Sequence, residues 1–137
     1  MKEATKKRTD EGAPAGAWLM GAAGWLVPGA GHLLQGRWWR GLLLGGTVYA
    51  MFLLGMGFGG HLFDFQDTGS GLLAQVFSLF NWGAGALYGL CWVARIGFTE
   101  RAELATFEYG NTFLLLAGLV NYLAMLDAFD IRAGRKP

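Results

Sequence analysis

Hydrophobic residues gather in four long runs of the chain that contain no Asp, Glu, Lys or Arg. These runs are residues 12–36, 41–63, 68–94 and 109–126. At about 1.5 Å of helix per residue, each can cross a hydrocarbon layer of roughly 30 Å, the last one only just. The pattern predicts an all-α integral membrane bundle of about four transmembrane helices, at residues about 17–34, 41–60, 71–94 and 112–129.

The charged residues fall mostly in tails and connectors. Residues 1–14 mix both signs, which predicts a disordered N-terminal tail ahead of a membrane domain at about residues 15–131. Residues 132–137 form a basic C-terminal tail. Residues 99–108 alternate charged with apolar positions, which predicts a short helix lying in the membrane interface.

Composition argues against a soluble globular domain and against a nucleic-acid-binding protein. Hydrophobic residues make up 53% of the chain and charged residues 15%, whereas a soluble domain carries about 25% charged residues. The net charge of +1 leaves no basic face, so nucleic acid is not an expected partner. The expected surroundings are a lipid bilayer.

Pro28 interrupts the first run and, with Gly29 and Gly31 beside it, should end or kink the helix near Val27. Two topologies follow. A complete first span places both termini on one side with seven Lys and Arg against four, whereas a re-entrant first segment changes the count to eight against three. We favour four full spans, because non-helical backbone at membrane depth persists only where protein or water satisfies it. The four-span count favours cytoplasmic termini under the positive-inside rule.

The 23 glycines are more than twice the usual share of about 7%. Gly41 with Gly45, and Gly85 with Gly89, are spaced about one helical turn apart. In lipid, such small residues let helix backbones approach closely. The spacing predicts contact faces for packing against a second copy of the chain or a larger membrane complex. No internal repeat is evident.

The two histidines offer little scope for a metal centre. His32 and His61 are predicted at opposite ends of neighbouring spans, roughly 30 Å apart by helix rise, too far for one ion. Neither Ser70 nor Ser78 has a His or Lys placed by spacing to activate it, so no enzyme, metal or cofactor is predicted. Ligation of a pigment or haem by His32 alone is the alternative to a simple interfacial histidine.

Asp127 and Asp130 lie three residues apart at the end of the fourth span, hence on one helix face. Asn121 lies deeper in the same span. Polar side chains inside a membrane mark helix contacts or an ion path. Because Arg132 follows, we expect interfacial pairing to explain the two aspartates, with a proton or ion pathway as the alternative.

Two stretches of the sequence resemble known families. Residues 25–36, Trp-Leu-Val-Pro-Gly-Ala-Gly-His-Leu-Leu-Gln-Gly, resemble the hairpin of the two-transmembrane-domain proteins, with Leu33-Leu34 in place of their usual aromatic pair. Residues 106–130, from Thr-Phe-Glu-Tyr-Gly-Asn to Leu-Asp-Ala-Phe-Asp, are the stronger match. Together with the Pro-Gly-x-Gly-His element, they resemble a bacterial family of small multispanning proteins catalogued as domain of unknown function 6677.

The second resemblance covers most of the chain and implies a bacterial inner-membrane protein without an assigned activity. It brings no catalytic residues, only motif positions: Pro28, Gly29, Gly31, His32, Gly36, Glu108, Tyr109, Gly110, Asn121, Asp127 and Asp130.

We therefore expect a non-enzymatic accessory or scaffold subunit of the bacterial cytoplasmic membrane. It would pack through Gly-rich helix faces, as a homo-oligomer or within a larger complex. One alternative is a small transporter or ion-pathway component that uses Asn121, Asp127 and Asp130. The other is a pigment- or haem-associated subunit of a bioenergetic complex that binds through His32.

Overall fold

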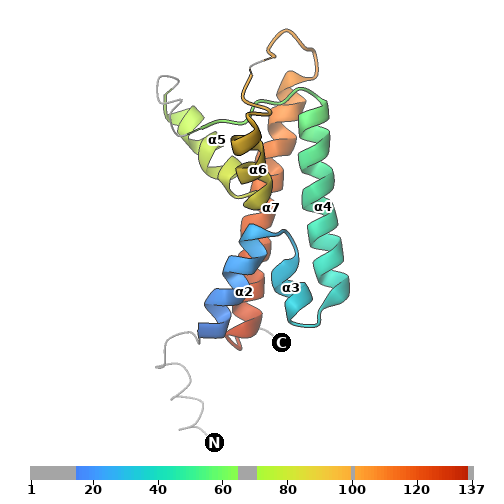
Figure 1. The fold of residues 1–137 in the computed structure, drawn as a ribbon, viewed down its shortest axis with the longest axis vertical. Coiled ribbons are helices and arrows are strands. Elements are labelled where there is room, and N and C mark those ends of the chain that lie inside the picture. The colour runs from blue at the N-terminus through green and yellow to red at the C-terminus, as the bar shows by residue number, and fades with distance from the viewer. Residues whose placement is uncertain (1–14, 65–70, 100, 136–137) are drawn as a thin grey trace, which may run out of the picture.

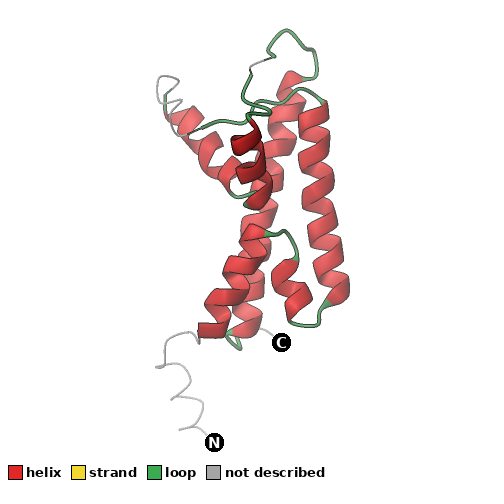
Figure 2. Cartoon of the chain, in the orientation of Figure 1, coloured by secondary structure: helices red, strands yellow, loops and turns green. Residues whose placement is uncertain are grey.

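The described part of the chain folds into helices joined by turns and by longer loops (Figures 1 and 2). The structure, a computed structural model, describes residues 15–64, 71–99 and 101–135. Every regular element in these ranges is helical, which confirms the all-α prediction. In chain order the helices are α2 (Ala15–Leu26), α3 (Ala30–Leu34), α4 (Trp38–Gly57), α5 (Leu72–Trp82), α6 (Ala86–Ala94) and α7 (Phe107–Arg132).

Two of these helices are long and apolar enough to cross a membrane by themselves. They are α4, with 20 residues, and α7, with 26. Helices α5 and α6 pass the same test only when taken together, and they are bent by 111° at the break between them. By length and composition, the described residues thus contain two helices that could cross a membrane, or three if the bent pair is one span, where the sequence predicted about four. In Figure 1, α4 and α7 run antiparallel along the length of the molecule.

The first run forms a helical hairpin, which is the re-entrant alternative to a full span. Helix α2 ends at Leu26, as predicted from Pro28, and the chain turns through Gly29, whose φ is +86°. Both ends of the hairpin lie beside the last turns of α7. A Cβ at Gly16 would lie 3.1 Å from Nε of Arg132, and Nε2 of Gln35 donates to the carbonyl of Ala128 at 2.9 Å. The 12 residues of α2 reach only about 18 Å, roughly half the depth of a bilayer.

The third run forms a second helical hairpin, where the sequence predicted one continuous span. The break falls at residues 83–85, and Gly85 has a φ of +62°. The ring of Phe63, just after α4, lies 5.2 Å from that of Phe77 in α5, and its carbonyl accepts from the hydroxyl of Tyr88 in α6. Because both arms contact this connector, the second hairpin opens toward the opposite end of the bundle from the first (Figure 1).

Helix α7 is the central element, since α2, α4 and α5 all pack against it. The apolar core joins α4, α6 and α7 through Val48, Phe52, Tyr88, Leu114 and Ala117. Many large apolar side chains instead lie on the outer surface, as expected of a protein surrounded by hydrocarbon. Among the most exposed are Leu19, Trp39, Leu43, Leu72 and Val93.

The connector before α7 differs from the interfacial helix expected at 99–108. Residues 101–106 form turns, with the Leu104 amide donating to the carbonyl of Arg101, and α7 begins only at Phe107. Leu104 contacts the backbone at Gly59, and the Thr106 hydroxyl donates to the carbonyl of Phe58 at 2.7 Å. Tertiary contacts with the end of α4 therefore determine the path of this segment.

Neighbouring glycines of α4 allow a matched test of the packing. A Cβ at Gly45 would lie 2.6 Å from the carbonyl oxygen of Pro28, whereas a Cβ at Gly46 meets nothing within 4 Å. We expect Gly45→Ala to reduce the free energy of unfolding by about 1–3 kcal/mol through overpacking. Gly46→Ala should leave it unchanged or raise it by up to about 1 kcal/mol, because Ala favours the helix. Thermal unfolding in mild detergent measures both, and equal effects would contradict the packing described.

Candidate functional site

Each hairpin has a tip where its two helices are interrupted, at residues 27–29 in the first and 83–85 in the second. The two tips meet at the middle of α7, where Asn121 is completely buried. Its side-chain amide donates two hydrogen bonds. One goes to the carbonyl of Trp25 at the end of α2, at 2.9 Å. The other goes to the carbonyl of Gly83 at the end of α5, at 2.7 Å. A single side chain therefore holds both tips against α7.

Both carbonyls need a donor because their helices are interrupted. In a continuous helix, the carbonyl of Trp25 would accept from the amide of Gly29, and that of Gly83 from the amide of Leu87. Helix α2 has ended before Gly29, and the Leu87 amide donates to Ala84 instead. In hydrocarbon, an unpaired carbonyl costs several kcal/mol. The two hydrogen bonds from Asn121 remove that cost at both breaks.

The tips approach each other closely, backbone against backbone. A Cβ at Gly85 would overlap the carbonyl oxygen of Trp25, and a Cβ at Gly83 would lie 2.6 Å from that of Gly118. The rings of Trp25 and Trp82 pack edge to face, with centroids 5.3 Å apart. Glycine is required at these positions because any larger residue would separate the tips from each other or from α7.

Asn81 is a second buried amide near the same tips. It lies on the buried face of α5, only 1% exposed, two residues before Gly83. Neither its Nδ2 nor its Oδ1 has a hydrogen-bond partner among the described residues, and the same is true of Oδ1 of Asn121. Buried polar side chains are normally paired, so these atoms are an exception that requires a reason.

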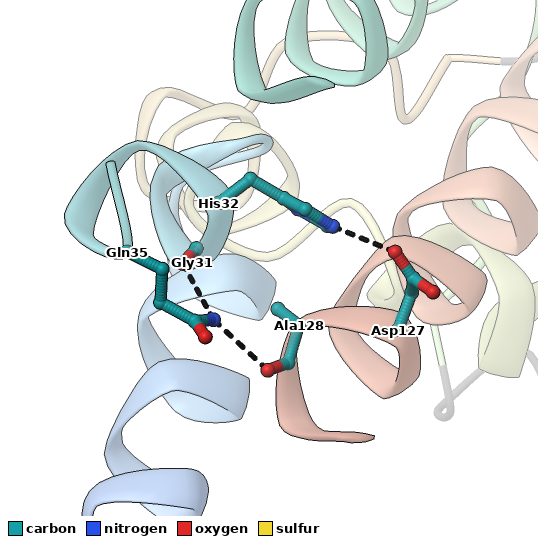
Figure 3. Close-up of polar contacts among 5 residues, drawn as sticks. All are labelled: Gly31, His32, Gln35, Asp127 and Ala128. Carbon is teal, nitrogen blue, oxygen red and sulfur yellow. Dashed lines mark hydrogen bonds and ion pairs between the residues drawn. The ribbon is translucent and has the colours of Figure 1, made fainter. Parts of the chain in front are cut away.

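A separate polar cluster fastens the first hairpin to the end of α7 (Figure 3). His32 on α3 is 1% exposed, and its Nε2 lies 2.8 Å from Oδ2 of Asp127. Beside it, Nε2 of Gln35 donates to the carbonyls of Gly31, at 3.0 Å, and Ala128, at 2.9 Å. Because α3 has only five residues, these contacts supply the anchoring that such a short helix lacks by itself.

The partners of the two aspartates differ from those expected. Asp127 is paired with His32, and Asp130 lies 3.4 Å from Arg135 at the surface. Arg132, which the sequence placed as their interfacial partner, lies beside Gly16 of α2. The His32–Asp127 pair joins residues 95 positions apart, so helix spacing alone did not reveal it.

The histidines lie apart, as the sequence predicted. The backbone amide of His61 donates to Oδ1 of Asn111 at 2.7 Å, near the start of α7, whereas His32 contacts the end of the same helix. Within the described ranges, no three His, Cys, Asp or Glu side chains are grouped as ligands of one metal ion. A pigment or haem bound through Nε2 of His32 would have to displace Asp127.

The remaining motif positions have distinct places. Gly29 and Gly31 are buried at close contacts of the first hairpin, Pro28 is buried beside them, and Gly110 is buried where α7 meets the end of α4. Three others face outward: Gly36, Glu108 and Tyr109.

Three polar residues with clear structural roles or unusual environments were not selected from the sequence, namely Gln35, Asn81 and Asn111. A carboxamide inside or next to a long uncharged run was the signal available for all three.

The chain belongs to a family of unknown function (DUF6677), whose model matches residues 19–137. Comparisons with curated proteins and with solved structures give no match.

The two buried asparagines of α7 use different atoms of the side-chain amide: Asn121 uses its nitrogen and Asn111 its oxygen. Substitution by Asp removes the nitrogen and keeps an oxygen, so it should affect the two positions differently. Asn121 donates to carbonyls, whereas Asn111 accepts from the His61 amide. We expect Asn121→Asp to destabilise the fold by on the order of 1–3 kcal/mol for each carbonyl it orphans. Asn111→Asp keeps its acceptor oxygen and should destabilise much less. Thermal unfolding in detergent compares them, and equal losses would contradict the assigned roles.

The two aspartates of α7 provide a second comparison. Asp127→Leu leaves the buried His32 without its carboxylate partner and should reduce stability by about 1–3 kcal/mol. Asp130→Leu removes only an exposed ion pair, worth about 0–1 kcal/mol. In a His32→Leu background, the effect of Asp127→Leu should shrink, because the pair acts as a unit. A double-mutant cycle that gives no coupling would contradict this pairing.

Proposed function

We propose that this DUF6677 protein is a non-enzymatic membrane protein that passes a small polar solute across the bilayer. The observation that carries the proposal is the meeting of two short helical hairpins, inserted from opposite ends, at the middle of α7. The level of the bundle at which the two tips meet Asn121 is called the tip layer, and it forms the centre of the proposed route.

Interrupted helices at membrane depth support such a role. Lipid-exposed irregular backbone is not tolerated in hydrocarbon, so breaks occur where protein or a polar route satisfies them. In secondary transporters, discontinuous helices form the substrate sites near the bilayer midplane. Asn121 lies about 16 Å from the C-terminal end of α7, close to half the hydrocarbon thickness.

Further polar side chains of α7 continue from this layer toward the C-terminal end. Asp127 and Asp130 follow Asn121 by about 9 and 13 Å of helix rise. Their side chains are 27% and 32% exposed, so both are accessible from outside the core. In this proposal they form the exit of the route, with His32 holding Asp127 in place.

We place the protein in the cytoplasmic membrane of a bacterium, with both termini in the cytoplasm. The end where α2 begins and α7 ends carries Arg37, Arg40, Arg132 and Arg135, and the other end carries Arg95 and Arg101. The positive-inside rule assigns the first of these ends to the cytoplasm.

The second candidate is a subunit that packs as a homo-oligomer or as an accessory or scaffold in a larger complex. The faces around Gly41 and Gly45 are occupied within the chain by the first hairpin. A different face of α4 supports this candidate, with Gly46 open and a groove lined by Ala50, Leu53, Leu54, Gly57 and Phe58. Small residues on such a face allow close approach of another helix. A partner recovered in fixed ratio from native membranes would favour this role.

Reconstitution tests the transport proposal directly. Vesicles containing the purified protein should be more permeable than protein-free vesicles, in proportion to the protein incorporated. Stopped-flow light scattering measures water, urea and glycerol, and fluorescent indicators measure Na⁺, K⁺ and H⁺. Asn121→Asp should abolish the increase, because the tips lose the donors that hold them, and Asn111→Asp should retain it. Permeability equal to that of empty vesicles for every solute would refute the proposal.

A further inference from the structure

The layer where the hairpin tips meet contains hydrogen-bonding groups that the described chain does not use. Both polar atoms of the Asn81 side chain are buried without a partner, as is Oδ1 of Asn121. The two residues belong to one layer, because Asn121 holds the carbonyl of Gly83, two positions after Asn81. Ser78, one turn earlier on the same buried face, is satisfied by the carbonyl of Ala74. The unused groups are thus concentrated at the tips.

We propose that this layer binds a small neutral solute with both hydrogen-bond donors and acceptors, and that Asn81 is the side chain that binds it. The inference rests on the proposed function and specifies its substrate class. An amide buried without a partner weakens the fold, and a leucine of similar size would not. A solute that pairs with the amide explains why a polar residue occupies this position.

The chemistry of the layer favours a neutral solute over an ion. Helices α2, α5 and α6 contain no Asp, Glu, Lys, Arg or His. Toward the C-terminal end of α7, the first such residue after Asn121 is Asp127, about 9 Å along the helix and paired with His32. An ion here would therefore lose its hydration without meeting a countercharge.

The unpaired polar atoms of this layer include both hydrogen-bond donors and hydrogen-bond acceptors. Asn81 presents two donors and an acceptor, and Asn121 adds an acceptor. The C-terminal ends of α2 and α5 and the N-terminal end of α6 meet in the same layer, so partial charges of both signs are present. Urea, glycerol and water each carry both donors and acceptors, which matches this combination of hydrogen-bonding groups.

The layer is closed in this structure, because the polar atoms of Asn81 are buried. The contacts across the tips are made by glycine and backbone carbonyls, notably Gly85 with Trp25 and Gly83 with Gly118. The solute reaches Asn81 when these contacts separate. Asn121 is the positioning residue that keeps both tips, and with them the binding layer, assembled on α7.

The test compares wild-type protein with Asn81→Leu, Asn81→Ser and Ser78→Ala in vesicles, using water, urea, glycerol, Na⁺ and K⁺ as probes. Wild-type protein should pass one or more neutral probes and neither ion. Asn81→Leu should lower that flux about tenfold or more, the effect expected from one lost hydrogen bond in the rate-limiting complex. It should also unfold at the same or a higher temperature, since an unpaired amide is removed. Asn81→Ser, still polar, should retain most of the flux, and Ser78→Ala should match wild type.

The outcomes separate this inference from the proposed function. Flux of Na⁺ or K⁺ without neutral solutes would overturn the neutral-solute inference and leave transport standing. Neutral flux unchanged in Asn81→Leu would likewise remove Asn81 from the route. If Asn81→Leu does not fold, Asn81→Ala takes its place, and unchanged neutral flux in a folded Asn81→Ala protein would contradict the inference. Absence of flux for every probe would overturn both proposals.

Discussion

The arrangement of the chain depends on the carboxamide of Asn121, which donates to two carbonyls that interrupted helices leave free. Pro28 cannot supply an amide to the helix before it, and the second break lies in a sequence without proline. Water can satisfy such breaks in a soluble protein, but hydrocarbon cannot. An amide donor at the middle of α7 therefore makes two half-length hairpins possible where the sequence length would allow two full spans.

This solution constrains the residues around it. The carbonyls of Trp25 and Gly83 can both accept from the Asn121 amide only if the two tips lie against α7 and against each other. That closeness explains Gly85 beside Trp25, and Gly118 beside the carbonyl of Phe80, where a Cβ would overlap the oxygen. Glycine weakens a helix by about 1 kcal/mol relative to alanine, and the close tertiary contacts offset that cost. The abundance of glycine is thus partly a requirement of backbone meeting backbone within the chain.

Features that depend on residues close together in the sequence could be predicted from it. Features that depend on contacts between distant segments could not. Uncharged runs predicted the helices, and Pro28 predicted the first break. The second break has no proline, and its apolar flanks have the composition of a continuous span. The tripeptide Gly-Ala-Gly occurs at both tips, at residues 29–31 and 83–85. Its presence at the predicted first break was the available sequence signal for the second break. No local rule pairs His32 with Asp127, because the hairpin fold alone brings them together.

The two amides of the tip layer illustrate different uses of the same chemical group. Asn121 contributes to the fold through its donors, and replacing it would leave two carbonyls unpaired. Asn81 contributes nothing comparable, because neither of its polar atoms is paired within the described chain. A sequence selected only for stability would place an apolar residue there. Departures from local consistency concentrate at functional sites, since binding requires groups that the fold itself does not satisfy. The contrast between two asparagines in one layer is therefore stronger support for a binding role than either residue considered alone.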